Sequence, residues 1–96
     1  MLARENFVFT IGYDGESALV DGHARRQYAR LSTLELAQKG LFRAAWASAV
    51  HAESDEEKIQ VLDIYNATCK GNFTLDSDLG RLFGVHLLDN KKVKII

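Results

Sequence analysis

A chain of 96 residues with 47% hydrophobic and 26% charged residues is long enough for one modest hydrophobic core and too short for two. We therefore expect residues 1–96 to form a single folded domain. This composition argues against intrinsic disorder, and no apolar run approaches the ~20 residues that cross a bilayer, so no membrane-spanning segment is predicted. The net charge of −1 provides no general attraction for nucleic acid.

The sequence predicts no metal site, no cofactor and no catalytic residue. Cys69 is the single cysteine and cannot form a disulfide within the chain. His23, His51 and His86 are widely separated, without the cysteine or carboxylate spacing that is typical of zinc sites. Residues 1–6 lack the apolar stretch of a secretory signal, so we expect a cytoplasmic protein.

The first third of the chain predicts a β-hairpin. Asp14 and Gly15 separate two β-prone runs, and an Asp-Gly pair is the strongest short-range signal for a two-residue hairpin turn. With this turn, alternate residues of both runs lie on one apolar face, which a slip of one residue would scatter. The predicted apolar face consists of Phe7, Phe9, Ile11, Tyr13, Ala18 and Val20. The residues predicted to point outward are Val8, Thr10 and Leu19.

After the hairpin, the apolar period changes from two to about 3.6, which predicts three to four helices. Residues 23–31 are compatible with two helical turns, with an irregular turn as the alternative. Ser32 and Glu35 have the spacing of a capping box that begins the next helix. Gly40 either lies inside that helix or ends it, and we favour a bend there with a second helix over residues 41–52.

A further capping box, from Ser54 to Glu57, precedes a helix expected over residues 58–70, with Gly71 as its stop signal. The stripe expected to face the core consists of Val61, Leu62, Tyr65, Thr68 and Cys69. Cys69 is therefore interpreted as a small core residue. A last short helix is expected to begin at Asp76 or Ser77 and to carry Leu79, Leu82 and Phe83 before Gly84.

Residues 91–96 have the composition of an edge strand, and lysines on an edge strand protect it from unwanted pairing. We expect this strand to lie beside the hairpin. The predicted fold class is therefore α+β, with an N-terminal hairpin, three to four helices and a short C-terminal strand.

A basic cluster in residues 23–30 is one candidate functional site. Arg25, Arg26 and Arg30 surround Tyr28, and this combination can hold phosphates and stack on a base. The alternative interpretation is the solvated face of a connecting segment, which the acidic residues elsewhere in the chain favour.

The other candidate site is a protein interface. The outward-facing Val8, Thr10 and Leu19 are fairly apolar, and the edges of a hairpin are available to a second chain. Phe42 and Trp46 lie outside the main helical stripe. They belong either to a second layer of the core or to an interface, where aromatic residues are enriched.

We therefore expect a small non-catalytic protein-interaction or regulatory module of the cytoplasm, self-associating as a homodimer. The alternative function is a nucleic-acid-binding accessory protein that uses residues 23–30. An enzyme of unknown class is the third hypothesis, and neither a membrane nor a metal is an expected partner.

Overall fold

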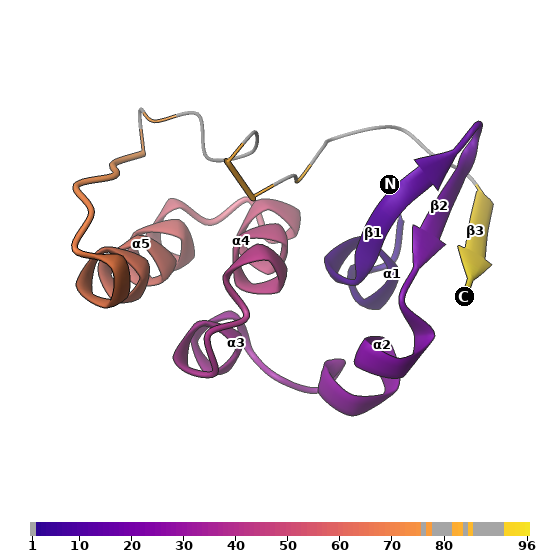
Figure 1. The fold of residues 1–96 in the computed structure, drawn as a ribbon, viewed down its shortest axis with the longest axis horizontal. Coiled ribbons are helices and arrows are strands. Elements are labelled where there is room, and N and C mark those ends of the chain that lie inside the picture. The colour runs from indigo at the N-terminus through magenta and orange to yellow at the C-terminus, as the bar shows by residue number, and fades with distance from the viewer. Residues whose placement is uncertain (1, 76, 78–81, 84, 86–91) are drawn as a thin grey trace.

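The structure, a computed structural model that describes residues 2–75, 77, 82–83, 85 and 92–96, has an α+β fold (Figure 1). Among these residues a three-stranded sheet lies at one end, and three helices pack together at the other (Figure 1). The helices are α1 (Arg4–Val8), α2 (Gly22–Tyr28), α3 (Thr33–Gln38), α4 (Phe42–His51) and α5 (Asp55–Cys69). The strands are β1 (Thr10–Asp14), β2 (Ser17–Val20) and β3 (Lys92–Ile95).

The predicted hairpin is present, but its turn lies one residue later than expected. Asp14 pairs with Ser17, so Gly15 and Glu16 form the turn. Gly15 has a φ of +59°, whereas Glu16 does not have a positive φ. A positive φ at the first central residue alone is the pattern of a type II′ turn, which matches the twist of the two strands.

A β-bulge at Ile11 changes which residues of β1 face the core. Tyr13 pairs with Ala18 as the turn requires, but the register then shifts and Thr10 pairs with Val20. Ile11 is left without a partner and is 49% exposed, whereas Thr10 is buried. The predicted positions of Ile11 on the apolar face and of Thr10 on the outward face are therefore wrong.

Residues 4–8 form a helix where the β-prone pattern around Phe7 predicted a strand. This helix, α1, packs against α4, and tertiary packing of this kind overrides local β propensity. Phe7 and Phe9 are buried as expected, but Val8 is also buried, at 3% exposed. The outward orientation expected for Val8 is wrong, because a helical turn directs neighbouring side chains differently from a strand.

The helices between the hairpin and residue 52 confirm the sequence pattern. Asp21 caps α2, accepting hydrogen bonds from two backbone amides. The capping box of Ser32 and Glu35 is complete at the start of α3. Gly40 has a φ of +80° and separates α3 from α4, which confirms the predicted bend.

Helix α5 begins at Asp55, three residues before the expected start, because the Ser54 hydroxyl accepts a hydrogen bond from the Glu57 amide. Its end is capped by Lys70, which has a left-handed φ of +56°, rather than by Gly71. Cys69 is exposed, so its predicted burial is wrong. Phe42, the first residue of α4, contacts Tyr65 of α5. The last turn of α5, which includes Cys69, extends beyond the start of α4 and is not covered by it.

Strand β3 pairs in parallel with β2, which confirms the predicted strand beside the hairpin. Gly22 allows this close approach, because a Cβ atom there would lie 2.6 Å from Cγ2 of Ile95. The helix expected after Asp76 falls largely outside the described residues.

The guanidinium group of Arg4 connects three parts of the helical layer. It donates hydrogen bonds to the carbonyl of Ala29 at 3.0 Å, the carbonyl of Leu31 at 2.7 Å and the Ser48 hydroxyl at 3.0 Å. The Ser48 hydroxyl also hydrogen-bonds the Thr33 hydroxyl, and both residues are buried. Arg4 thereby joins α1 to the α2–α3 connection and to α4.

We expect Gly15→Val to lower the free energy of unfolding by more than about 1 kcal/mol, because a β-branched residue is strained at a φ of +59°. Gly12→Val is the matched control, since a Cβ atom at Gly12 also has open space around it but the backbone is not left-handed. Urea unfolding measures both variants. Equal midpoints for the two would contradict the turn at Gly15.

We expect Arg4→Met to lower the free energy of unfolding by about 2 kcal/mol, because the carbonyls of Ala29 and Leu31 lose a charged donor. The exposed Arg26, changed to Met, is the control and should alter stability by less than about 0.5 kcal/mol. Similar losses in the two variants would show that the hydrogen bonds of Arg4 contribute nothing specific.

Candidate functional site

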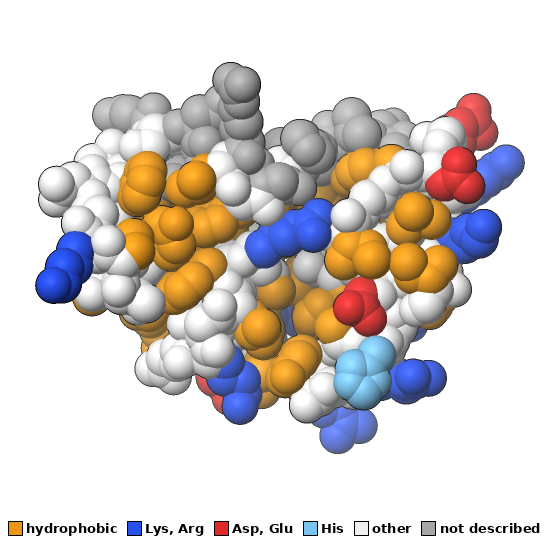
Figure 2. Space-filling view, viewed as in Figure 1, with side chains coloured by type: hydrophobic (Ala, Val, Ile, Leu, Met, Phe, Trp, Pro, Cys, Tyr) orange, Lys and Arg blue, Asp and Glu red, His pale blue; other side chains and the backbone are white. Residues whose placement is uncertain are grey.

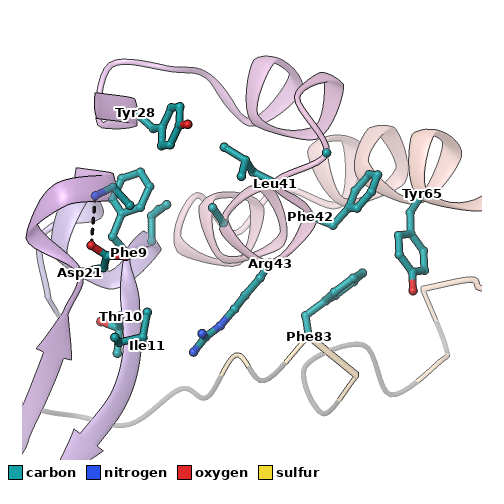
Figure 3. A pocket seen from close by; sticks show the side chains of 14 residues that line it. Phe9, Thr10, Ile11, Asp21, Tyr28, Leu41, Phe42, Arg43, Tyr65 and Phe83 are labelled. Atoms are coloured by element: carbon teal, nitrogen blue, oxygen red, sulfur yellow. Dashed lines mark hydrogen bonds between the residues drawn. The ribbon is translucent and has the colours of Figure 1, made fainter. Parts of the chain in front are cut away.

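A groove with a volume of about 460 Å³ lies between the start of the sheet and the helical layer. Most of the side chains that line it are apolar, and Figure 2 shows hydrophobic side chains gathered over the middle of this face. The walls come from the α1–β1 junction, from α2, from the start of α4 and from Tyr65 and Phe83 (Figure 3). The groove is concave and largely apolar, which makes it the candidate binding site.

Local structure explains how two of the walls are placed. The carboxylate of Asp21 accepts hydrogen bonds of 3.1 Å from the amides of His23 and Ala24, which starts α2 and directs Tyr28 at its end toward the groove (Figure 3). The bend at Gly40 then brings Leu41 to the opposite wall.

Aromatic rings pack against one another along the far wall of the groove. Tyr65 packs edge-to-face against Phe42, at 4.9 Å between ring centroids, and against Phe83, at 5.0 Å. Phe83 in turn contacts the ring of Trp46 at 5.9 Å. Edge-to-face aromatic pairs contribute stability in addition to that from the burial of their apolar area.

Arg43 places a positive charge on a wall that is otherwise largely apolar, and its side chain extends between β1 and Phe83 (Figure 3). Burial raises the pKa of the Tyr13 hydroxyl above 10.0, and the nearby charge of Arg43 acts in the opposite direction. The second ionised group on the groove, Asp21, is held by the amides at the start of α2. The groove therefore combines apolar walls with one cation and one carboxylate that caps α2.

The residues of the predicted basic cluster lie in different surroundings. Tyr28 lines the groove, whereas Arg30 lines a separate polar hollow that it shares with Arg4. Arg26 is exposed and lies two residues before Tyr28, which is about 200° around a helix. Arg25 is half-buried. Arg25 precedes Tyr28 by three residues and therefore lies on an adjoining face of α2, so the arginines of the predicted cluster are divided among different surroundings.

The five predicted interface residues are divided among different surroundings. Val8 and Thr10 are buried and contribute to the floor of the groove, and the half-buried Phe42 forms part of its wall. Trp46 is 6% exposed and belongs to the core, the first of the two interpretations that the sequence left open. Leu19 is half-buried on the sheet and does not line the groove.

Sequence analysis missed several groove residues, namely Leu41, Arg43, Tyr65 and Phe83.

No family model, curated protein or solved structure matches this chain. Among the described residues, no three His, Cys, Asp or Glu side chains are close enough to hold a metal ion. Within the same part of the chain, no helix is both long and apolar enough to span a membrane.

We expect Arg43→Gln to raise the pKa of Tyr13 further, because the variant removes a positive charge that favours the tyrosinate. NMR titration with ring-labelled tyrosine measures this pKa, and Arg26→Gln serves as the control. Since the folded-state pKa already lies above 10.0, the contribution of Tyr13 to stability is present below pH 10 and is lost as pH rises through that pKa. An unchanged pKa in Arg43→Gln would show that Arg43 does not act on Tyr13.

Proposed function

We propose that this protein is a small non-catalytic interaction module of the cytoplasm, and that its apolar groove binds an amphipathic helix of a partner protein. The observation that carries the proposal is the groove itself, with its largely apolar lining and its wall of packed aromatic rings. Grooves of this kind bind the apolar face of a helix through side chains spaced three to four residues apart.

Two features favour a helix as the occupant. The part of β1 that borders the groove contains the bulge at Ile11, where the ladder is irregular and does not suit the addition of a strand. The groove is also open to solvent along one side, whereas small-molecule sites usually enclose most of their ligand. A helix presents apolar side chains to the groove and leaves its polar face in water.

Arg43 on the groove wall acts on Tyr13 within the protein, so the apolar lining, and not the charge of Arg43, supports the choice of partner. The free, exposed thiol of Cys69 is compatible with the reducing conditions of the cytoplasm. Self-association through the groove, and nucleic-acid binding by the arginines of residues 23–30, are the competing hypotheses.

The test is selection from a displayed library of helical peptides, followed by calorimetry with the selected peptide. We expect selected sequences to repeat apolar residues at helical spacing. Ala44→Glu places a charge on the groove wall and should weaken binding at least tenfold. Ala67→Glu, at an exposed position on α5 outside the groove, is the matched control and should bind as the parent does.

Selected peptides that bind Ala44→Glu as tightly as the parent would contradict the groove as the site. A parent dimer that Ala44→Glu converts to monomers would instead identify a second copy as the occupant. Salt-sensitive RNA binding that is lost when Arg25, Arg26 and Arg30 are all changed to Gln would support the nucleic-acid hypothesis, because phosphate contacts release counterions.

A further inference from the structure

A second surface, independent of the groove, is the open edge of β3. Among the described residues β3 is one of the two outer strands of the sheet, since the strand order is β1-β2-β3, and unlike β1 it contains no bulge. Its four residues are all exposed. An edge strand of this kind presents a row of backbone donors and acceptors to which another strand can add.

The helical layer does not cover the apolar side chains of β3. Val93 pairs with Ala18 and Ile95 pairs with Val20, so each pair points to the same face of the sheet. Ala18 and Val20 are fully buried, whereas Val93 is 36% exposed and Ile95 is 53% exposed. The face that is core under β2 is therefore open to solvent under β3.

The backbone of β3 has the regular alternation that strand addition needs. The amide of Ile96 donates to the carbonyl of Val20 at 2.9 Å, and its carbonyl accepts from the amide of Gly22 at 3.1 Å. Because backbone groups alternate in direction along a strand, the amides and carbonyls of Val93 and Ile95 point away from β2. These groups are directed toward the position of a fourth strand.

The charges on β3 discriminate between possible occupants. Lys92 and Lys94 lie on the opposite face from Val93, and the ion pair of Lys92 with Glu16 is long, at 3.7 Å, and exposed. Antiparallel pairing with a second copy about Val93 would place Lys92 directly opposite the partner's Lys94. Like charges in that position are destabilising, so a second copy in this register is disfavoured.

We propose that the edge of β3 binds an extended segment of a partner protein in which acidic and apolar residues alternate. The apolar residues of that segment cover Val93 and Ile95, and its carboxylates pair with Lys92 and Lys94 on the other face. Its backbone hydrogen-bonds to the outward amides and carbonyls of β3, as in other cases of strand addition.

The probe is a capped octapeptide that alternates glutamate with valine, and binding to the full chain is followed by NMR with the β3 amides assigned. We expect saturable shifts at Val93 and Ile95, with at least tenfold weaker binding when lysine replaces glutamate in the peptide. A glutamate peptide that is N-methylated along the pairing edge should also lose at least tenfold, because its amides can no longer donate to β3. No saturable binding, or equal binding of the N-methylated peptide, would overturn the proposal.

A charge-reversal variant tests the lysines. Lys92→Glu with Lys94→Glu should bind the lysine–valine peptide in preference to the glutamate–valine peptide. The matched control changes the exposed Lys39 and Lys70 to Glu and should keep the parent's preference. An unchanged preference in the β3 variant would overturn the assignment, and the N-methylated peptide still decides the matter if that variant does not fold.

Two more measurements distinguish this proposal from self-association through β3 and from binding in the groove. Sedimentation of the parent alone should show no dimer that involves β3, and such a dimer, if displaced by the peptide, would overturn the choice of occupant. Ala44→Glu should bind the glutamate–valine peptide as the parent does, so failure of the groove proposal and failure of this one give different results.

Discussion

The guanidinium group of Arg4, together with the burial of Phe7 and Val8, determines the placement of α1, and α1 leads directly into the sheet. A helix of five residues has too few internal hydrogen bonds to be stable alone, so tertiary contacts must hold it. Arg4 provides these contacts through the carbonyls of the α2–α3 connection, while Phe7 and Val8 are buried on the other side. Because α1 leads directly into β1, the same contacts determine where Phe9 and Thr10 stand on the groove.

The elements that could be predicted from the sequence are those that depend on short-range interactions. The capping box of Ser32 and Glu35 forms within one helical turn, and the bend at Gly40 needs only a residue that tolerates a positive φ. In contrast, the helical state of residues 4–8 depends on partners 25 to 44 positions away, which Arg4 reaches through its hydrogen bonds. No local pattern around Phe7 contains that information, and the apolar alternation there favours a strand.

Most of the candidate site could not be predicted from the sequence, for a related reason. The bulge that exposes Ile11 and buries Thr10 reverses the orientation of two residues, while Tyr13 stays on its expected face. The groove then combines that junction with Leu41 and Phe83, which are far apart in the sequence. Among the predicted interface residues, Phe42 alone has a partly exposed side chain that lines the groove. The sequence could indicate it because its departure from the helical stripe is a local signal.

Both open surfaces follow from the position of α4 at the centre of the helical layer. Helix α4 packs against α1, α3 and α5, so its ten residues are divided among three neighbours. The core that results buries the inner face of β2 but does not extend to β3, and it leaves an apolar hollow beside the start of α4. A chain of 96 residues buries a smaller fraction of its surface than a longer one does, so apolar groups such as Ile95 remain uncovered. The two surfaces differ in the kind of partner that they suit, because one is bounded by side chains of helices and the other by a regular backbone edge.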